Sequence, residues 1–427
     1  MAVSRQIVQC QVCETLTIIR IQIGYLEQHP LRVPCGSCGI LISGTAFINQ
    51  DKIDFRVEYQ NATQVPGDTG DFHIEASPEF LTEKLKKLEK GGVPIFMSPF
   101  MIALSGLGHE GYEAFRHSTI RFSHLVREDW PRLRRINELW LGRKLPLLAK
   151  EVAGLLPVEQ FPMKNELQCL MAIRRLNLFF LQSVLDSKRF ESTCDLIFGE
   201  QKNSTTAKIS QLTELAENLD KRGVLHRFDE RILLVFGQFV DRFNYMIPAL
   251  GLRFYKTLDP DILVQRGITT TSFEDLKQFF VDSYELAADL LTLLVGWNNV
   301  SVRGSWNQMF PKRKDVQTLD QFEDKPKGIR IQQFLTGAEA FDSLVKPQLD
   351  VPLRNAIAHG TYRYDGVSQQ ITYYPSGHET ESDKQSIYLI CFVRKCLDQF
   401  DSIHSLYELL YQTRKLLFLK AGQVPVP

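Results

Sequence analysis

Apolar and polar residues alternate with a period of two over much of the first sixty residues. The segments 17–23 (TIIRIQI) and 53–60 (IDFRVEYQ) carry this pattern most clearly. A strand of this kind buries one face and leaves the other in water, so both segments are predicted to be β-strands. The polar stretch 61–71 contains a Pro-Gly-Asp turn and is predicted to be a linker.

After the linker, the apolar residues recur at the 3.6-residue period of a helix. A Ser-Pro pair at 77–78 is typical of a helix N-terminus, and three leucines follow it at helical spacing. Longer helical patterns cover residues 113–155 and 165–200. The sequence therefore predicts a helical middle region.

The C-terminal half carries the clearest helical patterns. Apolar residues recur at helical spacing over 228–256, and a capping sequence at Ser272 begins a second helix of the same kind. Three further predictions complete this half: a short helix at 350–359, a hairpin that pairs 362–364 with 368–374, and a long helix from 382 to 420.

We therefore predict a mainly α-helical fold in three parts. A small β module comes first, a helical region follows, and the last part is a helical bundle with a β-hairpin inserted before its final helix. The expected boundaries are 1–60, 72–225 and 226–427.

Composition narrows the class of protein without identifying it. Hydrophobic residues make up 44% and charged residues 23% of the 427 residues, which is typical of globular proteins. Lysine and arginine total 50, and so do aspartate and glutamate, so any nucleic-acid site must be a local patch. Apolar runs are shorter than the roughly 20 residues of a membrane span, and no secretory signal is visible. We expect a cytoplasmic protein with no membrane partner.

Four cysteines form two CxxC pairs, Cys10 with Cys13 and Cys35 with Cys38, and 21 residues separate the pairs. Two such turns can present four thiolates to one ion in a tetrahedral site, for which zinc is the expected metal. The residues resemble the zinc-ribbon family over roughly the first 45 to 60 positions. Such a closed site has no open position and is structural rather than catalytic. The alternative is four reduced cysteines, or a redox pair, in a small β module.

The segment 350–360 (DVPLRNAIAHG) is the most informative part of the chain. An N-cap aspartate, a proline in the first turn and the final Gly360 explain a short helix without any chemistry. His359 lies in the last turn, where a protonated imidazole interacts favourably with the helix dipole. Yet Arg354, Asn355 and His359 together provide a cation for phosphate oxygens, an orienting amide and a group that transfers protons near neutral pH.

The run Arg354-Asn355-Ala356-Ile357-Ala358-His359 fits the R-x4-6-H motif, in its R-N-x-x-x-H form, and so resembles HEPN-domain proteins. The resemblance covers about residues 226–427. It implies a helical bundle that dimerises so that two motifs face each other. It also implies a metal-independent endoribonuclease of prokaryotic antiviral defence, abortive infection or toxin action.

The same resemblance assigns roles to the motif residues. His359 would be the general acid or base, Arg354 the phosphate clamp and Asn355 the orienting group. A substrate 2′-hydroxyl would attack the adjacent phosphate and leave 2′,3′-cyclic phosphate and 5′-hydroxyl ends. One subgroup of the family has a tyrosine two residues after the histidine, where a partner nucleotidyltransferase modifies it. Here that position is Thr361, which argues against such an antitoxin.

The loop 303–314 interleaves cations with aromatic residues. Cations can follow phosphates while aromatic rings stack on bases, so this loop is a candidate RNA-binding segment. Its alternative is an exposed loop with a buried tryptophan. The candidate substrate-binding residues are Arg303, Trp306, Lys312, Arg313 and Lys314.

Taken together, the patterns predict a structural zinc ion and a homodimeric endoribonuclease acting on RNA, and they leave a regulatory protein partner open. A catalytically inactive adapter that binds nucleic acid or protein is one alternative. In it, Arg354 forms only a salt bridge and His359 is only a helix-terminal cation. A zinc-ribbon transcription regulator is another, although the ribbon carries few cations for it.

Overall fold

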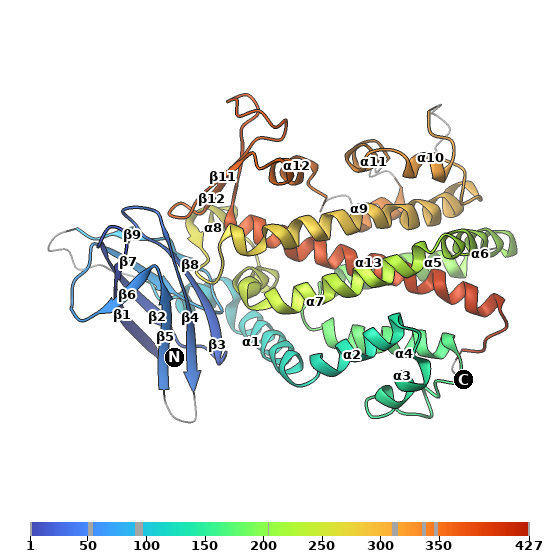
Figure 1. Cartoon of the computed structure of the whole chain (residues 1–427), viewed down its shortest axis with the longest axis horizontal. Coiled ribbons are helices and arrows are strands. Elements are labelled where there is room, and N and C mark those ends of the chain that lie inside the picture. Colours follow the sequence, from blue (N-terminus) through green and yellow to red (C-terminus); the bar gives the residue numbers. More distant parts are fainter. Residues whose placement is uncertain are drawn as a thin grey trace. The chain divides into compact units, whose positions relative to one another are not determined.

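The computed structural model describes residues 2–49, 54–89, 97–203, 205–309, 315–334, 339–345 and 349–425. Within these residues the protein is mainly α-helical and carries small β-sheets, as predicted (Figure 1). The chain divides into two compact units, each collected from three separate segments of the sequence. The first unit comprises 1–123, 241–281 and 352–397; the second comprises 124–240, 282–351 and 398–427. The cysteine pairs and the Arg354 motif both belong to the first unit.

Two β-sheets form the N-terminal module of the first unit. One has the strand order β6-β1-β2-β7-β9 and the other β3-β4-β5, and all neighbours are antiparallel except β2 and β7. Val8 and Ile19 from the first sheet share one core with Val33 and Ile42 from the second, and all four are fully buried. Apolar and polar residues alternate in these strands because every second side chain enters the shared core. The strands are β1 (Val3–Cys10), β2 (Leu16–Gln22), β3 (Gln28–Pro34), β4 (Leu41–Asn49), β5 (Asp54–Gln60), β7 (Phe72–Ala76) and β9 (Lys86–Lys87).

The β module extends into residues that were expected to form a linker and a helix. Strand β6 (Ala62–Val65) lies in the expected linker and pairs with β1. The described residues 77–89 form no helix. They include β8 (Thr82–Glu83), which pairs with β10 (Arg266–Gly267). The Ser77 hydroxyl accepts hydrogen bonds from two following backbone N–H groups, and its own N–H donates to the Thr269 hydroxyl. These tertiary contacts override the helical spacing of the leucines.

A further three-stranded sheet, β11-β12-β13, follows the motif helix in the first unit. Strands β11 (Tyr362–Asp365) and β12 (Gln370–Tyr373) confirm the predicted hairpin. The prediction that the last helix starts at 382 is wrong, because β13 (Gln385–Tyr388) pairs with β12 as a third strand. That helix, α13, therefore covers Leu389–Lys420.

Several helices supply residues to the first unit, and most of the long ones also supply residues to the second. They are α1 (Pro99–Glu128), α7 (Val224–Leu250), α8 (Pro260–Gln265), α9 (Phe273–Arg303), α12 (Val351–His359) and α13. The start of α9 and the extent of α12 agree with the predicted capping sequences.

All secondary structure described in the second unit is helical. Buried ion pairs cross its core: Arg414 Nη2 lies 2.9 Å from Asp229 Oδ2, and Arg174 Nε lies 2.7 Å from Glu408 Oε2. Because a buried charge without its partner is costly, these pairs fix how α4 (Glu166–Leu181), α7 and α13 pack within the unit. Its further helices are α2 (Trp130–Leu141), α3 (Leu145–Val152), α4 (Glu166–Leu181), α5 (Ser187–Lys202), α6 (Thr206–Lys221), α10 (Leu319–Glu323) and α11 (Lys327–Phe334). In the part of the chain described, no helix combines the length and the hydropathy needed to cross a bilayer.

Candidate functional site

The four cysteines of the two CxxC pairs meet in one cluster in the β module. Their sulfur atoms all lie within 4.8 Å of one another, with 3.7 Å between Cys10 and Cys38 and 3.5 Å between Cys13 and Cys35. Cys10 ends β1 and Cys35 follows β3, so the two sheets bring the pairs together. In a tetrahedral site with Zn–S bonds of about 2.3 Å, the sulfurs are about 3.8 Å apart. The cluster can therefore hold a zinc ion, and the protein would fill all four coordination positions.

Local hydrogen bonds and burial give the thiols different acidities. Hydrogen bonding with Thr15 lowers the pKa of Cys13 to about 6, whereas burial raises the pKa of Cys35 to about 12. Zinc binds thiolates, so metal binding must release the proton that the Cys35 thiol retains. Gly39 closes the second CxxC turn with φ of +74°, a conformation that favours glycine.

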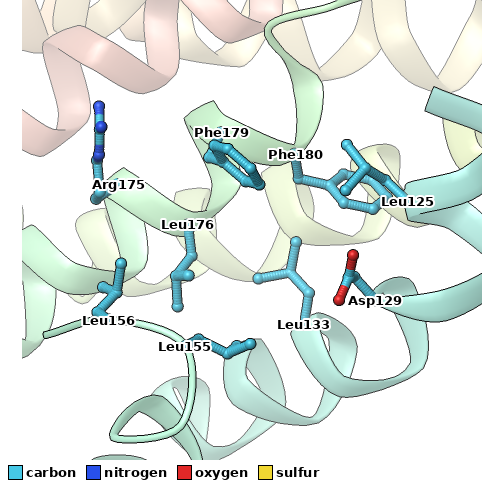
Figure 2. A pocket seen from close by; sticks show the side chains of 9 residues that line it. All are labelled: Leu125, Asp129, Leu133, Leu155, Leu156, Arg175, Leu176, Phe179 and Phe180. Carbon is cyan, nitrogen blue, oxygen red and sulfur yellow. The ribbon is translucent and has the colours of Figure 1, made fainter. Parts of the chain in front are cut away.

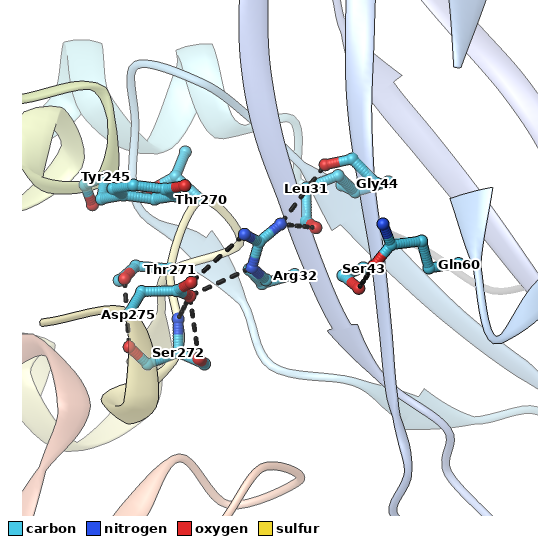
Figure 3. Close-up of polar contacts among 10 residues, drawn as sticks. All are labelled: Leu31, Arg32, Ser43, Gly44, Gln60, Tyr245, Thr270, Thr271, Ser272 and Asp275. Atoms are coloured by element: carbon cyan, nitrogen blue, oxygen red, sulfur yellow. Dashed lines mark hydrogen bonds and ion pairs between the residues drawn. The ribbon is translucent and has the colours of Figure 1, made fainter. Parts of the chain in front are cut away.

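Arg32 connects the strand before the second CxxC pair to the N-terminus of α9 (Figure 3). Its Nε and Nη2 donate to the two carboxylate oxygens of Asp275 at 3.0 and 3.2 Å, and its Nη1 donates to the Leu31 carbonyl at 3.0 Å. The guanidinium also lies 5.5 Å from the centre of the Tyr245 ring. Asp275 accepts two more bonds, from the N–H and the hydroxyl of Ser272, each at 2.8 Å. One carboxylate thus caps α9 and anchors β3.

Further contacts join the β module to the sheet β11-β12-β13 that follows α12. A Cβ added to Gly366 would lie 3.2 Å from the Cβ of Pro34, and Lys84 Nζ lies 4.2 Å from the centre of the Tyr388 ring. The sequence did not predict these contacts. The partners are far apart in the chain, and the capping pattern at the start of α9 was the one signal that pointed to any of them.

Helix α12 carries the candidate catalytic residues on the side opposite its buried anchors. Leu353 and Ala356 are fully buried, whereas His359 is exposed and Arg354 and Asn355 are half-buried. At 100° per residue, Arg354 and His359 stand at the two edges of the outward face, about 140° apart, with Asn355 between them. Val351 is buried within the same arc, so the exposed part of this face is its C-terminal end, around His359.

Arg354 and Asn355 are in direct contact, since the guanidinium Nη1 donates to the amide oxygen of Asn355 at 3.1 Å. Just beyond the motif, Gly360 ends the helix with φ of +71°. The N–H of Thr361 then donates to the Ala356 carbonyl at 2.9 Å, and its hydroxyl donates to the Tyr374 carbonyl at 2.9 Å. Thr361 is therefore a structural residue that joins the end of the helix to the hairpin.

The candidate RNA-binding residues of the 303–314 segment do not form one open surface in the part that is described. Arg303 pairs with Glu339, donates to Asn299 at 2.9 Å and has a side chain only 8% exposed. Trp306 is half-buried, and its backbone carbonyl accepts a bond from Asn299 at 3.0 Å. Both belong to the second unit, whereas the motif belongs to the first. Three candidates lie outside the described residues: Lys312, Arg313 and Lys314.

Comparison with known proteins does not place the chain in a family. No protein-family model matches the sequence, and no curated protein or solved structure shows significant similarity to it. The functional interpretation therefore rests on the residues and their geometry.

Proposed function

We propose that the protein is a metal-independent endoribonuclease whose active site is formed by the α12 helices of two chains. One observation carries the proposal. The proton-transfer group His359 and the phosphate-binding cation Arg354 border the outward face of one helix, whose opposite side is anchored by buried residues. The R-N-x-x-x-H spacing of the motif supports the same function.

The proposed reaction needs no group beyond those of the motif. The 2′-oxygen of a ribose forms a bond to the adjacent phosphorus, and the bond from that phosphorus to the 5′-oxygen of the next nucleotide breaks. His359 of one chain takes the proton of the 2′-hydroxyl, and the protonated imidazole of the other chain gives a proton to the leaving 5′-oxygen. Arg354 stabilises the negative charge on the non-bridging oxygens, and Asn355 orients the guanidinium through its 3.1 Å hydrogen bond.

A second chain is part of the proposal because one α12 offers a single imidazole. Two facing helices would supply both the acid and the base and would place the arginine at the edge of one face beside the histidine of the other. Ala358, which lies between Arg354 and His359 on the outward face together with Asn355, is small and exposed, and it leaves room for close approach. The cysteine cluster has no catalytic role here, because four thiolates leave zinc no open position.

The direct test incubates the purified protein with end-labelled RNA in the presence of EDTA. We expect cleavage that yields 2′,3′-cyclic phosphate ends, and a loss of about 100-fold or more in His359→Ala. His378→Ala is the matched control, because His378 is another exposed histidine of the same unit. Zinc content is measured in every sample, so that metal loss is distinguished from loss of catalysis. Full cleavage by His359→Ala would overturn the assignment.

The arginine has its own control. Arg354→Lys keeps the charge but loses the forked contact with phosphate, and we expect it to reduce the cleavage rate strongly. Arg363→Lys, on the exposed face of β11, is expected to leave the rate unchanged. Dilution supplies the test of the composite site: if two chains are needed, activity per chain falls as sedimentation shows the dimer dissociating.

The biological setting in the proposal, antiviral defence or a regulated toxin, has a separate test. Controlled expression of the wild-type chain should arrest bacterial growth, and the same amount of His359→Ala should not. If RNA stays intact in every assay while the folded protein binds RNA or a protein partner, the non-enzymatic adapter replaces the nuclease as the favoured function.

A further inference from the structure

A cavity of about 250 Å³ lies within the second unit, between the end of α1, α2, α4 and the loop that follows α3 (Figure 2). Leucine and phenylalanine side chains form most of its wall. Two of its lining residues are charged, Asp129 and Arg175. Figure 2 shows them at opposite ends with leucines between them, and the Asp129 carboxylate lies beside Leu133.

Asp129 holds the N-cap position of α2 but does not cap the helix. An aspartate here normally accepts a hydrogen bond from the first turn, and this one accepts none. Its carboxylate also has no ion-pair partner among the described residues. The charge is therefore available to the cavity that it lines.

Aromatic rings lie at the same cavity. Phe179 and Phe180 both line it, and the Phe180 ring centre lies 5.3 Å from that of Trp130. A carboxylate together with aromatic rings favours an ammonium group, through charge and through the negative faces of the rings. Arg175 at the far end of the cavity repels a cation, so the ammonium group is expected to bind at the Asp129 end.

We propose that this cavity binds a small apolar primary amine, with its ammonium at Asp129 and its apolar body among the leucines. A cavity of about 150 Å³ holds a benzene ring. A volume of about 250 Å³ therefore accommodates an aryl ring with a short alkyl chain. The site is independent of α12 and of the proposed nuclease activity.

Three probes of nearly equal shape test the proposal on the full chain: 3-phenylpropylamine, 3-phenylpropanol and 3-phenylpropionate. Calorimetry should rank the amine about tenfold tighter than the alcohol, with the acid weakest. Trp130 supplies a second readout, since its ring contacts Phe180 and its fluorescence should respond to binding. Trp130→Phe should remove that fluorescence change and leave the calorimetric affinity intact.

Variants separate the role of the charge from the role of the cavity. Asp129→Asn should lower the affinity for the amine to that for the alcohol and leave the alcohol unaffected. Leu155→Phe, at a half-buried loop position in the wall, should abolish binding of all three probes. Leu147→Phe, 56% exposed on α3, is the control and should bind as wild type does. Tighter binding of the acid, no saturable amine binding at millimolar concentration, or an unchanged preference in Asp129→Asn would each overturn the proposal.

Discussion

Substitution of Asp275 by alanine is expected to destabilise the first unit by about 3 to 4 kcal/mol. The carboxylate accepts two bonds from Arg32 and two from Ser272 at the start of α9. The side chains of the ion pair are only 16% and 18% exposed, so water cannot replace the lost partner of the guanidinium in full.

The magnitude has two parts. Breaking a fully buried ion pair costs about 3 to 5 kcal/mol, and the residual exposure of Arg32 lowers this to about 2 to 3 kcal/mol. Loss of the helix cap adds about 1 kcal/mol. Asp275→Asn keeps an acceptor oxygen and nearly the same shape, so we expect it to cost less than the alanine variant.

The assay is a double-mutant cycle in urea with Asp275→Ala, Arg32→Met and the double variant. All four tryptophans lie in the second unit, so fluorescence does not report on the first. Unfolding of the first unit would be followed instead by release of the zinc that the cysteine cluster is expected to hold. Once Arg32 is gone, loss of the carboxylate should cost only the cap, which gives a coupling of about 2 to 3 kcal/mol. The exposed pair of Arg56 and Glu58, 63% exposed on each side, is the control and should couple by less than about 0.5 kcal/mol.

Two results would refute this reasoning. One is a cost below about 1 kcal/mol for Asp275→Ala, and the other is a coupling near zero in the cycle. Either would mean that solvent or a neighbouring acceptor satisfies the guanidinium, and that β3 does not depend on the start of α9.

Three further predictions concern the metal, a buried imidazole and the hairpin. Cys35→Ser should release zinc and unfold the β module in metal analysis and circular dichroism, whereas Cys194→Ser should keep the zinc. Burial lowers the pKa of His404 to about 3, so its contribution to stability is complete above about pH 6.5 and is lost as the pH falls toward 3. His404→Phe should reduce the slope of unfolding free energy with pH by up to about 1.4 kcal/mol per unit in urea titrations from pH 7 to 4. Gly366→Val should press against Pro34 and speed amide hydrogen exchange in the hairpin; unchanged exchange would contradict the contact.

Long periodic segments of the fold could be predicted from sequence because their signals are local. The capping residues at Ser272 lie within one turn of the helix that they start, and Gly360 marks the end of α12 through its own backbone conformation. Short segments could not be predicted in this way. Residues 77–89 carry helical leucine spacing, but β8 within them pairs with β10 and β9 pairs with β7. Residues 385–388 become a strand because β12 lies beside them. In both segments the secondary structure depends on a strand that lies outside the segment.

The same distinction applies to the site. Each CxxC turn places its two thiols close together, so the cysteine cluster could be predicted from the positions of the four cysteines. The partner of Arg32 is 243 residues away, and no local pattern connects it to Asp275. Arg303 was selected as a cation of a loop, but its partner Glu339 is supplied by a segment that the loop sequence does not reveal.

Because the first unit is built from three separate segments of the sequence, it can complete its folding only after the last of them has been synthesised. Its first 123 residues are synthesised early, but the segment that carries the motif and the hairpin extends to residue 397. At about 5 to 20 residues per second, the ribosome needs roughly 15 to 55 s to bridge that interval. A nascent chain therefore holds its β module for many seconds without the helix and hairpin that complete the unit. If α12 cuts RNA, the timing of translation shields the message and the ribosome from a chain that is still being made.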